Sequence, residues 1–248
     1  MRATIVTARK RPDLAERARE LTADVWPEYN AHGVVPLRYW PGLYDVFPDF
    51  QYVLYDEDAD DVVAEGHSLP LVWDGTADGL PGGIDGAMAA AFDLQEAGGE
   101  ANTLCAMAIE IPPRHQRQGL SRTMIAAMAR VAADHRLRNL IAPVRPSAKE
   151  SYPVTPIERY ASWTREDGLP FDPWMRVHVR AGGEILRPEP RSLYIEGSVG
   201  EWEAWTEMAF PESGEYVFPR GLAPVTIDRG GDVGRYWEPN VWMRHRVA

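Results

Sequence analysis

The residues of this chain that could best bind an anion lie between residues 116 and 122. Gln116, Gly119 and Ser121 precede apolar residues at helical spacing, which predicts a tight turn entering a helix. The first turn of a helix leaves backbone N–H groups unpaired, and the helix dipole adds partial positive charge there. Gly119 allows close approach of the backbone because it has no Cβ. The turn is therefore a candidate phosphate-binding site.

Arginine is concentrated around this turn. Residues 114–138 contain six arginines and one acidic residue, Asp134, in a chain whose formal net charge is −11. Such an island could hold several phosphate groups, although a solvated helix face would have the same composition. The six are Arg114, Arg117, Arg122, Arg130, Arg136 and Arg138.

The turn and the strand end before it resemble the acyl-coenzyme A (acyl-CoA) signature of the GNAT superfamily of N-acetyltransferases. Ile111 and Pro113 match a Val-x-Pro strand end, and the residues from Gln116 to Ser121 match Gln/Arg-x-x-Gly-x-Gly/Ala. The resemblance implies an α/β fold with a mixed, splayed β-sheet and helices on both faces. It implies an acyl-CoA-dependent N-acyltransferase of a small amine, with acetyl-CoA as the expected donor. A non-catalytic coenzyme-binding or regulatory protein of the same fold is the alternative.

The resemblance also assigns coenzyme contacts. The backbone of Ile109, Glu110 and Ile111 would run beside the pantetheine arm, where an unpaired N–H would polarise the thioester carbonyl. The amides of the turn would hold the pyrophosphate. The turn consists of Gln116, Arg117, Gln118, Gly119, Leu120, Ser121 and Arg122.

Four residues are candidates for proton transfer in such a reaction. His178 takes the place of the tyrosine in the family pattern Tyr-x-x-x-Gly-Phe, and histidine exchanges protons near neutral pH. Tyr160 is a second candidate acid, while Glu110, or else Glu158, is a candidate base. Structural alternatives stay open for each: His178 as a capping residue, Tyr160 as a core residue, and Glu110 under a covering helix.

Other classes of site have little support in the sequence. The six histidines form no His-x-x-x-His pair and have no cysteine partners, so no metal site is expected. The single cysteine, Cys105, excludes an intrachain disulfide and is expected to pack as a small hydrophobe. An isoelectric point near 5.0 argues against nucleic acid as a partner. Without a long apolar run or a leader segment, we expect no membrane partner and a cytoplasmic location.

The pattern of elements places the signature in a βαβ unit. Strands are expected over 3–7, 51–55, 62–69, 103–111 and 139–144, with 192–199 as the last core strand. Helices are expected over 12–25, 86–94 with Asp85 as its cap, and 120–131. Two more should start at a capping box around Thr155 and after Asp172. Between residues 28 and 50 the chain is rich in aromatic residues, which could line an acceptor site or pack in the core.

Two domain features depart from a minimal member of the superfamily. Residues 1–199 are expected to form the GNAT-like domain, with an insertion over about 146–171 that shapes the acceptor pocket. Residues 200–248 form an aromatic-rich extension. Its tryptophans predict that it packs on the core or on a second subunit, which makes a homodimer possible. These are Trp202, Trp205, Trp237 and Trp242.

Overall fold

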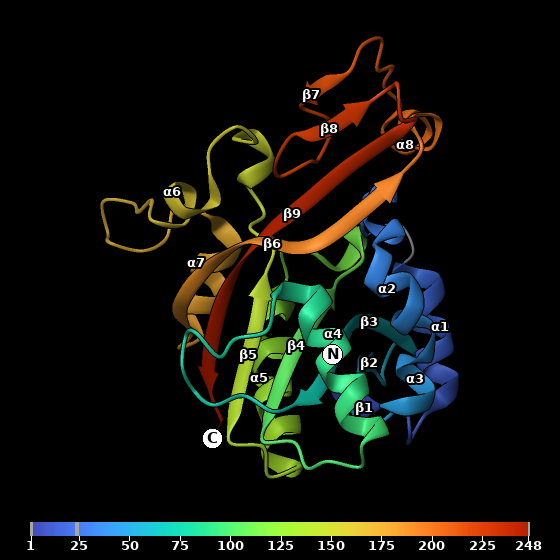
Figure 1. Ribbon diagram of the computed structural model, residues 1–248. Coiled ribbons are helices and arrows are strands. Elements are labelled where there is room, and N and C mark those ends of the chain that lie inside the picture. Colours follow the sequence, from blue (N-terminus) through green and yellow to red (C-terminus); the bar gives the residue numbers. More distant parts are fainter. Residues whose placement is uncertain (1, 23–24, 248) are drawn as a thin grey trace.

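The computed structural model describes residues 2–22 and 25–247 (Figure 1). Within these residues one sheet of nine strands has the order β1-β2-β3-β4-β5-β9-β8-β7, and β6 pairs with β9. The strands are β1 Ala3–Thr7, β2 Gln51–Asp56, β3 Asp61–Leu71, β4 Thr103–Glu110, β5 Asn139–Val144, β6 Glu184–Gly197, β7 Gly214–Tyr216, β8 Val225–Asp228 and β9 Val233–Arg246. The α/β class is therefore confirmed, as is the mixed sheet.

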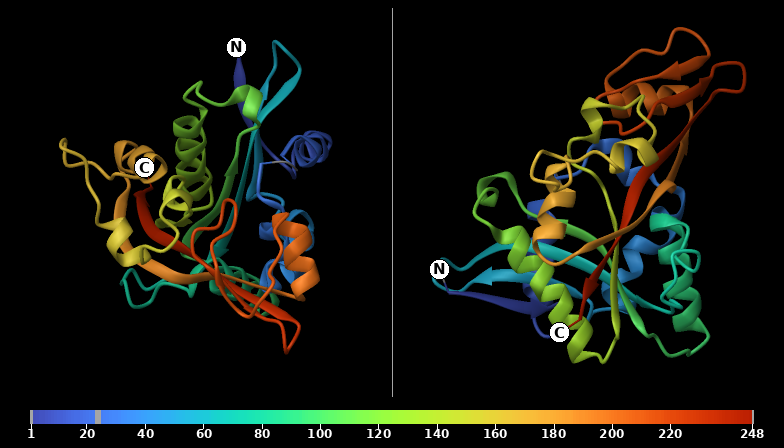
Figure 2. Two further views of the ribbon diagram at one scale, coloured as in Figure 1. Left: turned by 90° about the horizontal axis from the view of Figure 1, so that it is seen from above. Right: turned by 90° about the vertical axis from the view of Figure 1, so that its left-hand side faces the viewer.

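Helices cover both faces of this sheet (Figures 1 and 2). On one face α5 presents its apolar stripe, from Leu120 to Val131, and α7 packs beside it. The other face is covered by α1, α3 and α4. The helices are α1 Pro12–Thr22, α2 Val34–Tyr39, α3 Leu43–Val46, α4 Gly83–Glu96, α5 Leu120–Asp134, α6 Ile157–Ala161, α7 Pro173–Arg180 and α8 Val199–Thr206. None of the helices in the described part of the chain has the length and apolarity that a membrane crossing requires.

The only parallel pair among the described strands is also the point where the sheet opens. β4 and β5 pair at Thr103–Asn139, Leu104–Leu140 and Cys105–Ile141, and no further register follows. On its other side β4 shifts register against β3, so that Met107 has no partner between Ala106 and Ala108. An extra residue of this kind bends the strand that carries it. The bulge at Met107 therefore accompanies the separation of β4 from β5.

The last core strand is β9, so the expectation that residues 192–199 end the core is wrong. β9 pairs with β5, β6 and β8, and its Val241, Trp242 and Met243 are fully buried. The sequence did not indicate a buried strand here because Glu238, Pro239 and Asn240 interrupt the apolar pattern. Residues from 200 on thus contribute to the same sheet as the N-terminal strands.

Of the helix caps predicted from the sequence, one is present and two are not. Asp172 caps α7 as expected, accepting hydrogen bonds from the amides of Trp174 and Met175. The capping box at Thr155 is wrong, because α6 starts after Pro156 without a side-chain cap. Asp85 does not cap α4 either: it lies inside the first turn, and its carboxylate accepts a hydrogen bond from the Tyr194 amide at 2.8 Å.

Candidate active site

A cavity of about 760 Å³ opens where β4 and β5 separate. Residues 106–110 of β4 and 142–144 of β5 line it on two sides, and Trp174 and His178 of α7 line it on another. Its other walls come from residues between 19 and 44, from α4, α5, β3, β6 and β9, and from Arg145 and Ser147 after β5. The cavity is therefore enclosed by both helical layers and by the divergent strands of the sheet.

The turn of residues 116–122 follows the end of β4; residues 116–119 and Arg122 are exposed, while Leu120 packs in the core. Gln116 Nε2 donates a hydrogen bond to the carbonyl of Ile111 at 3.0 Å, which ties the turn to the strand end. Arg117 and Gly119 have positive φ angles, 64° and 78°. Within the described ranges no hydrogen-bond acceptor is found for the backbone amides of residues 117–121. The unpaired amides and the open space above Gly119 fit a phosphate group.

The arginine island is exposed in full, and part of it borders a second cavity. This cavity, about 230 Å³, lies between α5, α7 and the end of β9. Arg122 lines it together with Arg180 and Arg246, which the sequence analysis missed because they are distant in the chain. Arg114, in contrast, contacts Asp61 at 3.3 Å.

Two buried carboxylates face each other in the main cavity. Glu65 of β3 and Glu110 of β4 are direct cross-strand partners, and they are 1% and 5% exposed. His67 lies beside them, so that one ligand atom from each of the three residues lies within 4.8 Å of the other two. Buried carboxylates placed opposite one another are unfavourable unless positive charge lies between them. The arrangement thus fits a cation, either an ammonium-type group or a metal ion.

Neighbouring residues hold these three side chains in place. Glu110 accepts a hydrogen bond from Trp26 Nε1 at 2.6 Å, and Glu65 accepts one from the Tyr44 hydroxyl. Gln51 uses its amide N–H groups on backbone carbonyls, so its oxygen accepts from His67 Nδ1 at 3.0 Å. This leaves His67 Nε2 directed toward Glu65, at 3.7 Å.

The charge on His67 depends on this environment. Burial by itself would lower the pKa of the ring, but the Glu65 carboxylate and, more weakly, Glu110 outweigh it and raise the pKa above its usual value. Arg19 supplies a further positive charge, its guanidinium carbon lying 3.8 Å from the centre of the Tyr44 ring. The carboxylate pair is therefore compensated from two sides and stays open to the cavity on the third.

The aromatic residues between 28 and 50 have both of the roles considered for them: some line the cavity and others pack in the core. Trp40 and Tyr44 line the cavity beside the carboxylates, where Trp26 joins them. Phe47 is buried in the core against Phe92 of α4, with ring centres 5.1 Å apart. Aromatic faces next to carboxylates form surroundings that favour organic cations.

The candidate acids lie in different environments. His178 is buried and lines the cavity, and its Nε2 has no hydrogen-bond partner among the described residues. Tyr160 does not line the cavity. Its hydroxyl donates to Asp172 at 2.9 Å inside an aromatic cluster, which favours the core-residue alternative. Glu158 is exposed on α6, and Cys105 is buried, with burial raising the pKa of its thiol.

Of the other candidates, Ile109 and Glu110 line the cavity while Ile111 is only half-buried at the strand end. In the insertion over about 146–171, only Ser147 borders the cavity. Its acceptor-shaping role stays a prediction. Glu65 and His67 were missed. Their polar alternation inside the apolar strand 61–71 was the one available signal.

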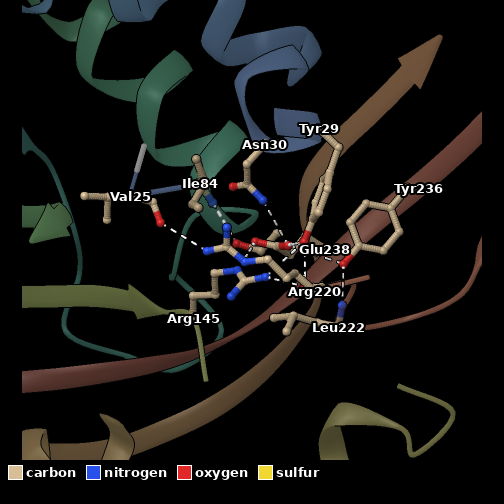
Figure 3. Close-up of polar contacts among 10 residues, drawn as sticks. Val25, Tyr29, Asn30, Ile84, Arg145, Arg220, Leu222, Tyr236 and Glu238 are labelled. Atoms are coloured by element: carbon tan, nitrogen blue, oxygen red, sulfur yellow. Dashed lines mark hydrogen bonds and ion pairs between the residues drawn. The ribbon is translucent and has the colours of Figure 1, made fainter. Parts of the chain in front are cut away.

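An ion pair between the segment after β5 and strand β9 lines one side of the cavity, and Figure 3 shows its polar contacts. Arg145, just after β5, contacts Glu238 of β9 at 2.9 Å. Tyr29 and Asn30, from the short helix η1 (Glu28–His32), donate to the same carboxylate. The network joins segments about 200 residues apart in the chain.

We expect Glu238→Gln to lower the free energy of unfolding by about 3 kcal/mol, because it leaves the buried Arg145 guanidinium without its counter-charge. In a chain of this size that corresponds to a melting temperature lower by about 6–12 °C. Glu196→Gln is the matched control, since its pair with Arg235 is exposed and such pairs contribute about 0–1 kcal/mol. Equal melting temperatures for the two variants, measured by calorimetry, would contradict the assignment.

Comparisons with known proteins agree with this geometry. No protein-family profile matches the chain. It is 30% identical over 274 residues to the arginine N-acetyltransferase avaD of Aspergillus versicolor, covering 98% of this chain and 94% of that protein. The loading GNATL domain of CurA from Lyngbya majuscula shares the fold, with a TM-score of 0.59, 17% identity, and coverage of 100% and 98%. The GphF GNAT-like decarboxylase, solved with isobutyryl-CoA, gives 0.58 at 14% identity with both chains covered fully. The relative that is 30% identical over nearly the full length of both proteins shows that this chain belongs to the GNAT superfamily of N-acetyltransferases, and the fold agrees.

Proposed function

We propose that this enzyme transfers an acetyl group from acetyl-CoA to a nitrogen of a cationic small molecule, with arginine as the first candidate acceptor. The observation that carries the proposal is the buried pair of Glu65 and Glu110, which shares one cavity with the opening between β4 and β5. The arginine acceptor is suggested by the relative that is 30% identical.

The coenzyme would enter between the two divergent strands. Amides of residues 117–121 would hold its pyrophosphate, because they are unpaired at a helix N-terminus. The pairing of β4 with β5 ends at Cys105, which leaves the later backbone groups of β4 without a partner on β5, and the pantetheine arm would run beside them. An N–H of this segment, between Met107 and Ile111, would polarise the thioester carbonyl.

The acceptor would bind where Glu65, His67 and Glu110 converge. An ammonium group can donate N–H groups to the Glu65 and Glu110 carboxylates, and a guanidinium can form a paired hydrogen bond with one carboxylate. Trp26, Trp40 and Tyr44 would surround the cation. Glu110 belongs to the strand that flanks the coenzyme, so we assign it the role of base that removes the proton from the attacking nitrogen.

His178 would supply the proton that the departing thiolate needs. Burial first, and the nearby His245 second, lower the pKa of His178 to about 3, so the ring is neutral at physiological pH. A neutral imidazole can still donate from Nε2 when its other nitrogen accepts a hydrogen bond. No metal has a part in this proposal, and the carboxylate pair is reserved for the substrate.

Location and assembly are proposed on narrower grounds. The lone cysteine fits a reducing compartment such as the cytoplasm. Trp237, which is 38% exposed on β9, offers an apolar contact for a second subunit.

The proposal is tested by acetyl-CoA titration followed by thiol release over an acceptor panel. The panel contains arginine, Nα-blocked arginine, agmatine, ornithine and a neutral amide isostere of arginine. It distinguishes the contributions of the two cationic groups of arginine from each other, and both from the contribution of molecular shape. We expect turnover with at least one arginine-like cation and none with the neutral isostere. Coenzyme binding without turnover on any acceptor would favour a non-catalytic coenzyme-binding protein. Tight binding of zinc that blocks turnover competitively would show that the carboxylate site prefers a metal.

A further inference from the structure

Two buried histidines connect the main cavity with the second one. His178 Nδ1 lies 2.9 Å from His245 Nε2, a hydrogen-bond distance between residues 67 positions apart. His178 borders the main cavity and His245 borders the second. The rings are 4% and 5% exposed as residues, so the contact between them is closed to solvent. The pair thus spans the wall that separates the two cavities.

Surrounding residues fix the rings in this arrangement. Trp174 presses against His178 with ring centres 4.4 Å apart and planes at 80°. Gly183 provides the space for His245, because a Cβ there would lie 2.7 Å from His245 Cε1 and 2.7 Å from the carbonyl oxygen of His178. A side chain at residue 183 would therefore displace one of the rings.

Both rings are neutral in these surroundings. Burial lowers the pKa of His178 and that of His245. The charged groups that border the pair on its second-cavity side are cations: Arg122 of α5, Arg180 of α7 and Arg246 of β9. On the main-cavity side His178 contacts the ring of Trp174. Two neutral rings sharing one hydrogen bond have two arrangements of their protons.

In the first arrangement His178 carries its proton on Nε2, inside the main cavity, and accepts at Nδ1 from His245 Nε2. In the second, His178 Nδ1 donates to His245 Nε2, and the proton of His245 is on Nδ1. The two arrangements differ only by the transfer of protons along the line Nε2–Nδ1–Nε2–Nδ1. His178 Nε2 and His245 Nδ1, the two ends of this line, have no partner within the described part of the chain.

We propose that His178 and His245 form a proton relay that carries a proton from water in the second cavity to the departing thiolate. The inference rests on the proposed function. As the new C–N bond is complete and the C–S bond breaks, sulfur keeps the bonding electron pair and accepts the Nε2 proton of His178. The proton on His245 Nε2 passes to His178 Nδ1, and water in the second cavity protonates His245 Nδ1. The hydroxide left there is neutralised by the proton that the acceptor nitrogen releases.

In this scheme His178 contacts the reacting atoms, whereas His245 acts through it as a positioning and relay residue. The arginine-lined cavity has an added role, because its positive charges keep His245 from holding a second proton. After the products leave, exchange with water restores the equilibrium between the two arrangements, and the first of them serves the next turnover.

The first test uses variants of His245 in the full-length enzyme. His245→Gln can still hydrogen-bond to His178 Nδ1 but cannot pass a proton on, and we expect it to lower the single-turnover rate of thiol release roughly 10- to 100-fold. The KM for acetyl-CoA should stay unchanged. In His245→Ala, added imidazole should restore part of the rate by occupying the second cavity. His135→Gln, an exposed histidine at the end of α5, is the control for loss of an imidazole.

The second test measures the hydrogen bond between His178 and His245 in the enzyme without substrate. In ¹⁵N spectra of histidine-labelled enzyme, His178 and His245 should stay neutral through the pH range where an ordinary histidine titrates. Each should show averaging between its two tautomers, and His245→Gln should leave His178 in one tautomer. A wild-type rate in both His245 variants, or one fixed tautomer in the unmodified enzyme, overturns the relay. Failure of every acceptor to release thiol from the wild type would instead refute the proposed function.

Discussion

Gly119→Asp is expected to weaken acetyl-CoA binding about 100-fold, equivalent to about 2.8 kcal/mol. Gly119 has a φ of 78° and unpaired amides on either side of it. An aspartate there adds negative charge to the place where we locate a pyrophosphate, and its side chain disfavours the left-handed backbone. Isothermal titration with acetyl-CoA measures the loss directly.

Gly168→Asp separates charge from backbone strain in this experiment. Gly168 has a φ of 75°, open space for a Cβ and an exposed position in the loop before α7, and it borders neither cavity. Both variants carry the same added residue in the same backbone conformation, so their thermal stabilities should fall alike. If the two bound acetyl-CoA equally well, the turn would not be the pyrophosphate site.

Glu110→Gln is expected to lower kcat/KM for a cationic acceptor about 10²- to 10⁴-fold, because it removes both a counter-charge and the assigned base. Glutamine keeps an oxygen to accept the hydrogen bond from Trp26 Nε1, so the local structure should persist. Steady-state thiol release measures the effect, and coenzyme affinity should stay within about threefold of wild type, which is less than 1 kcal/mol.

Two further variants distinguish the loss of a counter-charge from the loss of the base. Glu65→Gln removes the partner charge without removing the assigned base, so it should raise KM for the acceptor more than it lowers kcat. Glu158→Gln changes an exposed glutamate away from the cavity and should leave both parameters unchanged. A larger loss for Glu158→Gln than for Glu110→Gln would reverse the choice of base.

Sequence reasoning worked where local signals are strong. The strands over 3–7 and 139–144 agree with β1 and β5 residue for residue. The apolar stripe of α5 and the proline-started helix at Asp172 follow from periodicity and capping, which act over a few residues. Gly119 has a left-handed backbone conformation, which agrees with the tight turn that the glycine at this position predicted.

What sequence reasoning missed depends on long-range contacts. Glu65 and Glu110 become partners through a strand register that no local pattern specifies. His178 was a candidate through family alignment, but its contact with His245 requires the chain to bring β9 beside α7. Arg145 and Glu238 also line the cavity, and they form their ion pair although they lie 93 positions apart in the chain.

The placement of β9 determines when the enzyme becomes functional during its synthesis. β9 is the last of the described strands to leave the ribosome, yet it lies inside the sheet, next to β5. Until it emerges, the nascent chain exposes an unpaired edge of β5, and the acceptor cavity lacks Glu238 while the relay lacks His245. Such an edge is a pairing surface for other chains. We therefore expect activity to arise only after the final strand inserts beside β5.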